Sequence, residues 1–536
     1  MPSFALTARP PAGEAGPAPI ERDPDIIASR LEDAAHFPGG HAIELATPVS
    51  EAQIAAVLAR SSSVLPVGAQ SSLTGGATPM GETILSTARL KGIDILGTDR
   101  VRVLAGVSIA ELDRELARAG KYYPPAPTFD GAFTAGTIAT NAAGAATFKY
   151  GSTRKWVEAL TVVLPSGDVL DIERGVTRAH QDGHFDLHLA DGSIRVEIPR
   201  YQPPDVPKVS AGYWAEPAMD LIDLFIGSEG TLGIVTAATL RVLPSRPAFC
   251  LAFVPFPDRS GCLQFVARLR EAAWETWRDR DPRGIDVSAI EHMDARSLAI
   301  LREDGIDRVN GVEVPDGTSI ALLVTLELPP GTNAEQAYEE IGHARSSGAP
   351  DTPLVRFTAM LAEAGVLDDV DIAVPGDQTR AAQLLAVREG VPAAVNARVG
   401  RAKQVRDARI EKTAADMIVP FPMLERLLAL YDDKFGKRGL DVAVWGHISD
   451  GNVHPNVIPR SYEDVESGTA AILSLAREVL KMGGAPLAEH GVGRSRIKQE
   501  LLRMMYGDEG IDAMRRVKRA IDPDWKLSPG VLFPRS

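Results

Sequence analysis

Loops of small residues recur through the first half of the chain, each beside an apolar, strand-like segment. The first is PVGAQSSLTGG, from Pro66 to Gly76, and the second lies between Thr134 and Gly144. VSAGYW, at residues 209–214, and GSEGTLG, at residues 227–233, follow. Such loops expose backbone amides that can surround phosphate oxygens, and larger side chains would block that approach. One loop of this kind is an ordinary turn, but their repetition favours a backbone that wraps a long, phosphate-bearing ligand.

The length and composition of the chain restrict its class. At 536 residues it is too long for one ordinary core, so we expect two or three domains. Hydrophobic residues make up 45% and charged residues 24%, as in soluble globular proteins. The net charge of −14 argues against nucleic acid or an anionic membrane as the main partner.

The cysteines and the N-terminus indicate the cellular setting. Cys250 and Cys262 are too few for the four thiolates of an iron–sulfur cluster or for a disulfide framework. The Pro- and Ala-rich N-terminus lacks a signal-peptide core, and residues 1–39 are expected to form a partly disordered leader. We therefore expect a cytoplasmic protein, with peripheral attachment to the inner membrane left open.

Residues 40–245 show the pattern of an α+β domain, in which short apolar runs alternate with glycine turns and brief helices. No G-x-G-x-x-G follows a strand and opens a helix, which argues against a Rossmann unit. His180, His184 and His188 have the spacing of one helix face. The turn at Asp182–Gly183 and the alternation after it instead favour surface histidines in a loop and a hairpin.

Two histidines in the stretch GHISDGNVHPN raise the question of a shared site. His447 and His454 are seven residues apart, so on one uninterrupted strand they would face opposite sides. A turn at Asp450–Gly451–Asn452 can bring both rings to one point, where Glu489 could add a carboxylate. Such a set suits zinc, and also manganese or ferrous iron. The alternative is one core histidine and one that faces solvent, which the spacing alone slightly favours.

The order of these motifs resembles a known flavoprotein family. PVGAQSSLTGG, AGVSIAEL, TAGTIATNAAG with KYGSTR, and GSEGTLGI are similar to the FAD-binding domain of the vanillyl-alcohol-oxidase/para-cresol-methylhydroxylase (PCMH-type) superfamily. The C-terminal motifs resemble its D-lactate, D-2-hydroxyglutarate and glycolate dehydrogenase branch. The resemblance implies a two-subdomain FAD-binding domain at 40–245 and a cap at 246–482 with an antiparallel sheet flanked by helices. Residues 483–536 would return to the FAD domain.

The resemblance also implies which residues hold FAD. Neither histidine nor cysteine occurs between Ser61 and Gly151, where some relatives attach flavin covalently, so non-covalent FAD is expected. Ala135 and the Ala142–Ala143 pair depart from the paired glycines that are usual in the family. The implied cofactor-binding residues are Pro66, Val67, Gly68, Ala69, Gln70, Ser71, Ser72, Gly75, Gly76, Thr134, Gly136, Thr137, Thr140, Asn141, Gly144, Glu229, Gly230, Gly233 and Ile234.

The C-terminal motifs imply the chemistry. By resemblance, His447, His454 and Glu489 hold a divalent metal, zinc in the first instance, that chelates a 2-hydroxy acid. His490 would take the hydroxyl proton while the Cα hydride passes to flavin N5. Glu489 and His490 are adjacent, so they can serve one site only in an irregular loop, which the glycines that follow permit.

Substrate recognition involves both matches and departures. Arg388 matches the family's carboxylate-binding arginine, although a helix arginine paired with a nearby glutamate is a serious alternative, and Asn456 matches an assisting asparagine. The family lysine is replaced by Ala414, and an asparagine near the flavin by Ser528. Candidate replacements for the lysine lie in the unusually basic stretch 398–412, at Arg401, Lys403 and Arg406.

Several functions remain open at this stage. A dehydrogenase of this kind needs an external electron acceptor, such as an electron-transfer flavoprotein, a quinone, a cytochrome or a separate iron–sulfur subunit. An oxidase that uses O₂, a non-redox alkyl transferase of the ether-lipid synthase type and a non-catalytic subunit are the alternatives. The sequence leaves open which hydroxy acid is the substrate and whether the protein forms a homodimer.

Overall fold

The chain folds into two units, and each unit is built from segments that are not contiguous in the sequence. The computed structural model describes residues 3–125, 127, 129–343, 345–346 and 348–535. Unit 1 comprises Met1–Gly144, Gly151–Pro244 and Leu487–Ser536, and unit 2 comprises Ala145–Tyr150 and Ser245–Pro486. The C-terminal segment therefore folds in the same unit as the glycine loops, whereas a short piece from the first half of the chain folds in unit 2.

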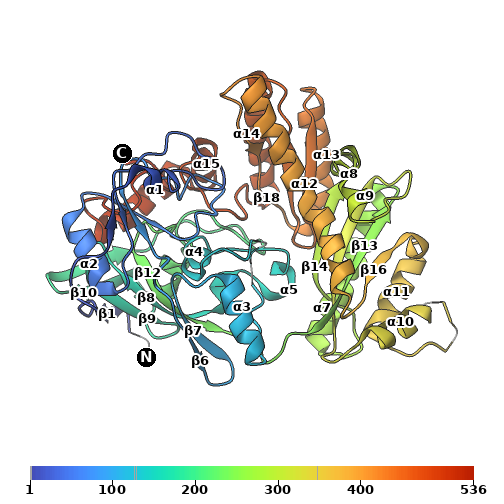
Figure 1. The fold of residues 1–536 in the computed structure, drawn as a ribbon, viewed down its shortest axis with the longest axis horizontal. Coiled ribbons are helices and arrows are strands. Elements are labelled where there is room, and N and C mark those ends of the chain that lie inside the picture. Colours follow the sequence, from blue (N-terminus) through green and yellow to red (C-terminus); the bar gives the residue numbers. More distant parts are fainter. Residues whose placement is uncertain (1–2, 126, 128, 344, 347, 536) are drawn as a thin grey trace. The chain divides into compact units, whose positions relative to one another are not determined.

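Three sheets build unit 1 (Figure 1). An antiparallel five-stranded sheet has the order β6-β7-β12-β8-β9. A four-stranded sheet has the order β2-β3-β5-β4, with parallel pairs at β3-β5 and β5-β4, and a three-stranded sheet has the order β1-β10-β11. The strands are β1 (Ala5–Thr7), β2 (Ile20–Glu21), β3 (Leu45–Ala46), β4 (Val64–Val67), β5 (Thr83–Ser86), β6 (Ile93–Leu96), β7 (Arg100–Leu104), β8 (Val157–Val163), β9 (Val169–Glu173), β10 (His184–Leu189), β11 (Gly192–Glu197) and β12 (Ile234–Arg241).

Side-chain caps define where the helices of unit 1 begin. The Ser50 hydroxyl accepts the N–H of Gln53 at 3.2 Å at the start of α2 (Glu51–Arg60). Ser108 and Glu111 form a reciprocal capping box at the start of α3 (Ile109–Arg118). The other helices are α1 (Pro24–Ala28), α4 (Thr134–Ala139), η1 (Thr153–Trp156), α6 (Leu221–Phe225) and α15 (Arg496–Ile521), which is kinked at Gly507.

The start of the chain differs from the disordered leader expected for it. Residues 5–7 form β1, which pairs in parallel with Asp186–His188 of β10. Arg9 forms an ion pair with Glu51 at 2.6 Å. Backbone pairing and charge thus order a stretch whose composition alone predicted disorder. The hairpin expected around residues 191–192 is present as β10–β11.

Unit 2 is built on one antiparallel sheet, which confirms the predicted sheet type. Its order is β16-β13-β15-β14-β19-β20-β17, with β18 also paired to β20. The strands are β13 (Ala248–Phe256), β14 (Asp286–Asp294), β15 (Ile320–Leu328), β16 (Asp371–Ala373), β17 (Thr413–Ala414), β18 (Met417–Ile418), β19 (Val442–His447) and β20 (Asn452–Val457). The helices are α5 (Thr147–Tyr150), α7 (Arg259–Asp279), α8 (Ala295–Asp304), α9 (Ile306–Val309), α10 (Ala334–Gly342), α11 (Pro353–Glu363), η2 (Leu367–Asp369), α12 (Gln378–Val405), η3 (Phe421–Met423), α13 (Leu424–Gly436), η4 (Ile448–Asp450) and α14 (Tyr462–Lys481).

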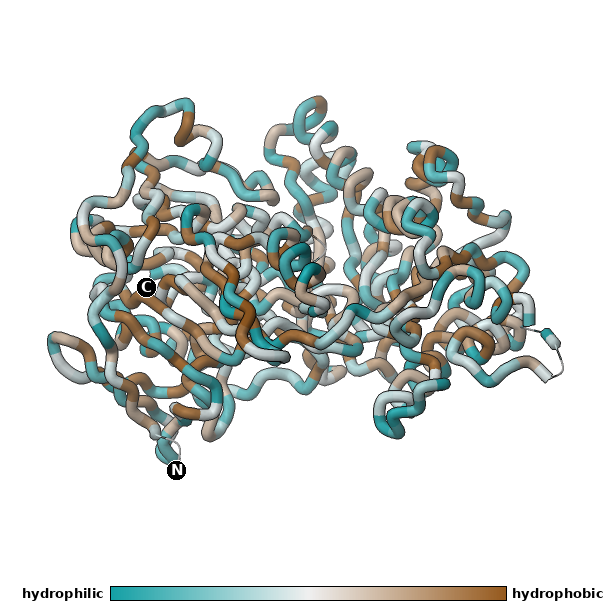
Figure 2. Tube along the Cα trace, turned by 60° about the horizontal axis from the view of Figure 1, so that its bottom comes forward, coloured by the Kyte–Doolittle hydropathy of each residue, from teal (hydrophilic) through white to brown (hydrophobic). Residues whose placement is uncertain are grey.

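The central strands of this sheet are almost continuously apolar. β13 reads AFCLAFVPF and β15 reads IALLVTLEL, and nearly all of their side chains are buried. Figure 2 shows the hydropathy of each residue along the chain, with hydrophobic stretches in brown and hydrophilic stretches in teal. Leu298 and Leu301 of α8 and Val391 and Val395 of α12 pack in the same core cluster as Leu323. Helices therefore cover the strands and remove their apolar side chains from water.

Partly buried ion pairs hold the segment Ala145–Tyr150 in unit 2. Lys149 Nζ lies 2.7 Å from Asp286 Oδ2 and 2.5 Å from Glu327 Oε2, and the Tyr150 hydroxyl donates to Glu327 at 2.7 Å. Phe148 packs against Trp277, with ring centroids 5.1 Å apart. The chain that leaves the second glycine loop is thus anchored in unit 2 before it returns to unit 1.

Replacing Lys149 with methionine should destabilise unit 2 by roughly 3 kcal/mol, because two carboxylates of low exposure lose their shared cation. Denaturant unfolding followed by tryptophan fluorescence measures this loss. Lys91→Met is the matched control, because the Lys91–Glu111 pair is exposed and should contribute less than about 1 kcal/mol. Equal losses in the two variants would contradict the anchoring role of Lys149.

Candidate active site

The two histidines of GHISDGNVHPN lie together on one hairpin of unit 2. His447 ends β19, and Gly451 turns the chain with a left-handed φ of 79° before β20 begins. In the register of the hairpin, His447 lies opposite Asn452 and His454 lies opposite Trp445. The two buried rings are 5.8 Å apart between centroids. The predicted turn is therefore confirmed, and it removes the objection that an odd spacing separates the two side chains.

Each histidine ring has a carboxylate behind it. His447 Nδ1 lies 2.9 Å from Glu291 Oε1 on β14, and His454 Nδ1 lies 3.3 Å from Asp416 Oδ1. The hydrogen bond to Glu291 fixes the orientation of the His447 imidazole and directs its Nε2 to the opposite side of the ring, and Asp416 places a carboxylate beside His454 Nδ1. Histidines that bind metals commonly have this arrangement. The donor chemistry of the hairpin thus fits a divalent metal.

Arg388 is held by the carboxylate that orients His447. Its Nε and Nη2 donate to Glu291 Oε2 at 3.0 and 2.9 Å, and both side chains are largely buried. Burial alone would raise the pKa of Glu291, but the charges of Arg388 and His447 hold it well below its usual value. Of the two interpretations of Arg388, the paired arginine is present, in a buried rather than a solvated setting. Its role toward substrate stays a prediction.

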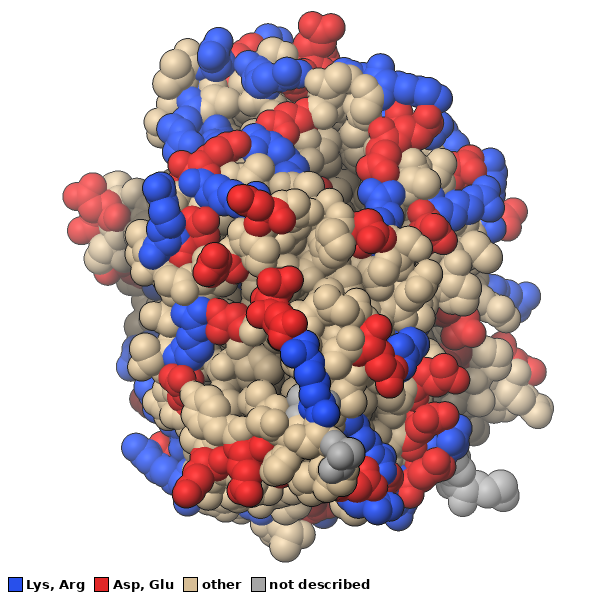
Figure 3. Space-filling model, turned by 90° about the vertical axis from the view of Figure 1, so that its right-hand side faces the viewer, with Lys and Arg blue, Asp and Glu red and all other residues tan. Residues whose placement is uncertain are grey.

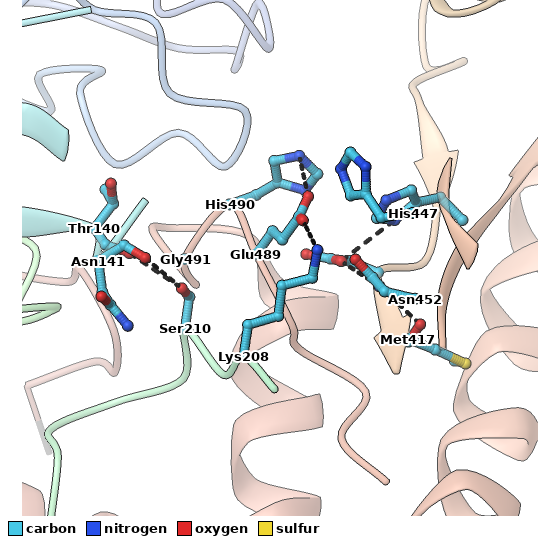
Figure 4. A network of polar contacts seen from close by, with 12 residues as sticks. Thr140, Asn141, Lys208, Ser210, Met417, His447, Asn452, Glu489, His490 and Gly491 are labelled. Carbon is cyan, nitrogen blue, oxygen red and sulfur yellow. Dashed lines mark hydrogen bonds and ion pairs between the residues drawn. The ribbon is translucent and has the colours of Figure 1, made fainter. Parts of the chain in front are cut away.

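Asparagines occupy the same hairpin. Asn452 Nδ2 donates to the Met417 carbonyl at 2.8 Å and to Asp416 Oδ1 at 3.3 Å (Figure 4). Asn456 is buried, and its Nδ2 donates to the His454 carbonyl at 2.9 Å. Ala414 lies opposite Asn456 in the strand register, so the position of the family lysine is beside this asparagine and carries no charge.

The basic stretch 398–412 is mostly the end of a helix. α12 continues through Pro392 to Val405. Arg398 pairs with Asp304 at 2.6 Å, so part of this charge serves packing within unit 2. The three candidate replacements for the family lysine, Arg401, Lys403 and Arg406, are exposed. On the face drawn in Figure 3, cationic and anionic side chains are interspersed.

Glu489 and His490 lie in an irregular loop of unit 1, as predicted. His490 has a left-handed φ of 54°, and its Nε2 lies 3.8 Å from Glu489 Oε2. The buried Lys208 forms an ion pair with Glu489 (Figure 4). Lys208 was missed in the sequence, because nothing local marks a pairing over 281 residues. The assignment of Glu489 as a metal ligand stays a prediction.

The glycine loops of unit 1 come together through backbone hydrogen bonds. The Glu229 N–H donates to the Ala139 carbonyl at 2.8 Å, and the Arg494 N–H donates to Thr74 at 2.9 Å. A Cβ added at Gly136 would meet no atom within 4 Å, so open space borders α4 as a bound cofactor requires. The Gln70 side chain instead donates to the Arg30 carbonyl at 2.9 Å and shapes its own loop.

The chain belongs to the FAD-linked oxidases. The FAD-linked oxidase C-terminal domain matches residues 247–532, and an FAD binding domain matches residues 43–173. A D-2-hydroxyglutarate dehydrogenase of Xanthomonas citri pv. viticola is 29% identical over 92% of this chain and 89% of its own. A D-lactate dehydrogenase of Anaerostipes hadrus is 26% identical over 87% of this chain and 83% of its own.

A solved structure with the same fold is that of an alkyldihydroxyacetonephosphate synthase. Its TM-score is 0.57 at 13% identity, over 99% of this chain and 89% of that one. The likeness is one of fold. Within the part of the chain that the structure describes, no helix has both the length and the apolar character needed to cross a membrane. Cys250 and Cys262 are buried free thiols.

Proposed function

We propose that this FAD-linked oxidoreductase oxidises a D-2-hydroxy acid of the D-lactate, glycolate or D-2-hydroxyglutarate class to the 2-oxo acid. The observation that carries the proposal is the histidine hairpin, in which His447 and His454 each have a carboxylate at Nδ1. Paired, oriented imidazoles suit a metal that chelates a carboxylate and its neighbouring hydroxyl. The names of the relatives support the same substrate class.

Two residues, Arg388 and Asn456, would bind the substrate, and a third, His490, would transfer the proton. Arg388 would bind the substrate carboxylate through its guanidinium group, which also holds Glu291. Asn456 would hydrogen-bond the substrate. His490 would accept the hydroxyl proton as the general base.

The two groups that the chain would hold supply the remaining chemistry. FAD in the glycine loops of unit 1 would accept the Cα hydride. A divalent metal at His447 and His454, with Glu489 as the third ligand, would lower the pKa of the substrate hydroxyl. Zinc is the first candidate, and manganese and ferrous iron suit the same ligands. Because Glu489 pairs with Lys208, metal binding would have to compete with this ion pair.

Anaerobic bleaching of the flavin tests the proposal directly. One of D-lactate, glycolate, D-2-hydroxyglutarate or a larger D-2-hydroxy acid should bleach the flavin within the mixing time of a manual assay. Where that acid is chiral, its L-isomer should not bleach the flavin. Removal of the metal with a chelator should slow bleaching at least about a hundredfold, since a Lewis acid contributes several kcal/mol. Added zinc, manganese or ferrous iron should restore it. A yellow protein that no hydroxy acid bleaches would refute the proposal.

The same preparation separates the alternatives. Rapid aerobic reoxidation of the reduced flavin would identify an oxidase. Slow reoxidation would identify a dehydrogenase, which passes electrons to an electron-transfer flavoprotein, a quinone, a cytochrome or an iron–sulfur subunit. A non-redox alkyl transferase is less favoured, because the similarity to the synthase structure is 13% in sequence and concerns the fold alone.

A further inference from the structure

Glu229 of the GSEGTLG motif directs its carboxylate at the loop that carries His490. Its Oε1 accepts the N–H of Val492 at 2.7 Å, and its Oε2 accepts the N–H of Gly493 at 2.8 Å. Both oxygens are therefore engaged by consecutive backbone amides two and three residues beyond His490. The sequence had assigned Glu229 to the cofactor. Its side chain contacts the C-terminal segment, whereas its backbone belongs to the glycine loops.

The backbone of Glu229 adopts a conformation that favours glycine. Its φ is 52°, in the left-handed region that costs a residue with a Cβ free energy. Its N–H donates to the Ala139 carbonyl at 2.8 Å, so the strained residue is also tied to the second glycine loop. A glycine would adopt this left-handed conformation at a lower cost in free energy. A glutamate at this position therefore indicates that its carboxylate is needed.

The segment that Glu229 contacts leaves room for nothing larger than glycine at two positions. A Cβ at Gly491 would lie 2.8 Å from Glu229 Oε1, and a Cβ at Gly493 would lie 2.3 Å from Thr74 Oγ1. The N–H groups of Arg494 and Ser495 donate to the Thr74 carbonyl at 2.9 and 3.1 Å. The loop is thus fixed to the first glycine loop on one side and to Glu229 on the other.

We propose that Glu229 is a positioning residue that holds the His490 turn against the FAD-binding loops, so that the imidazole is presented in one orientation. The catalytic consequence rests on the proposed function, in which His490 is the base. The structural consequence does not, because it concerns the backbone amides of Val492 and Gly493 alone.

The experiment should be done with the Glu229 carboxylate ionised. Burial raises the pKa of Glu229 to about 7, while the N–H groups of Val492 and Gly493 and the charge of Lys498 oppose that rise. At about pH 8.5 the carboxylate is mostly charged, and both oxygens can accept hydrogen bonds. FAD-loaded wild type, Glu229→Gln, Glu229→Ala and Glu51→Gln are compared. Glu51 is the matched control, because its carboxylate anchors the Ala12 N–H and Arg9 elsewhere in unit 1.

Hydrogen–deuterium exchange of the peptide that covers residues 487–495 gives the structural result. In Glu229→Ala, the amides of Val492 and Gly493 should exchange about ten- to hundredfold faster, because each loses a hydrogen bond to a charged group. Glu229→Gln, which keeps one acceptor oxygen, should lie between alanine and wild type. Glu51→Gln should match wild type in this peptide. Unchanged exchange in Glu229→Ala would overturn the proposal.

Anaerobic flavin reduction gives the catalytic result. Glu229→Ala should bleach about a hundredfold more slowly than wild type at saturating hydroxy acid with its FAD content unchanged, and Glu229→Gln should recover part of the rate. Faster exchange with an unchanged reduction rate would also overturn the positioning role. If no hydroxy acid bleaches wild type, the proposed function fails, and the exchange data still decide whether Glu229 holds the loop.

Discussion

Replacing His490 with alanine should leave FAD bound and slow bleaching of the flavin by a D-2-hydroxy acid about a thousandfold. A positioned general base contributes roughly 10²- to 10⁴-fold, and His490 is the proposed acceptor of the hydroxyl proton. The side chain is 36% exposed, so its loss should cost little stability. Visible absorbance measures the bound FAD, and stopped-flow absorbance under anaerobic conditions measures the reduction rate.

The His490 prediction has a matched control in unit 1. His188 on β10 is exposed and contacts Ser193, so His188→Ala should reduce its flavin at the wild-type rate. Imidazole added to His490→Ala should restore part of the lost rate, because a small base can then take the proton. Wild-type bleaching by His490→Ala would show that another group is the base. Loss of FAD from that variant would point to a structural role instead.

Local features of the active site were predictable from the sequence. The Asp450–Gly451–Asn452 turn depends on residues that are adjacent in the chain, and the hairpin that brings His447 to His454 follows from it. The irregular loop at His490 follows in the same way from the glycines that come after it. These elements depend on backbone conformations that a few neighbouring residue types decide.

The groups that orient these side chains were not predictable. Glu291 lies 156 residues before the histidine it contacts, in the buried part of a strand that also carries other polar residues. Lys208 is 281 residues from Glu489. Such pairs arise from tertiary packing, and a single sequence does not indicate which distant residues will be in contact. A charged residue in the interior of a strand is the clue that could have suggested Glu291.

Tertiary contacts also explain why two elements differ from the preference of their local sequence. The N-terminal residues have the composition of a disordered leader, but β1 finds a partner in β10. Pro392 normally ends or kinks a helix, yet α12 continues past it, because Val391 and Val395 are packed in the core of unit 2. In both cases, tertiary contacts override the preference of the local sequence.

Replacing His447 with alanine should remove the proposed metal and slow flavin reduction about a thousandfold or more, while FAD, whose proposed site is in unit 1, should stay bound. The variant loses one of the two proposed imidazole ligands, and Glu291 keeps its ion pair with Arg388. Elemental analysis after gel filtration measures the metal, and stopped-flow absorbance measures the rate. A variant that keeps stoichiometric metal would contradict the assignment of His447.

Glu291→Gln should weaken metal binding less than His447→Ala does. The imidazole of His447 remains in this variant, and only the contact that orients it is weakened. Outer-shell partners typically change metal affinity by about 10- to 100-fold, so a competition titration with a chelator should show a shift of that size. Glu327→Gln is the matched control, because Glu327 is also a buried carboxylate of unit 2 paired with a cation, Lys149, but it does not bond either histidine. If both variants weaken the metal equally, the effect reflects the stability of unit 2. A shift confined to Glu291→Gln would identify the carboxylate behind His447 as part of the metal site.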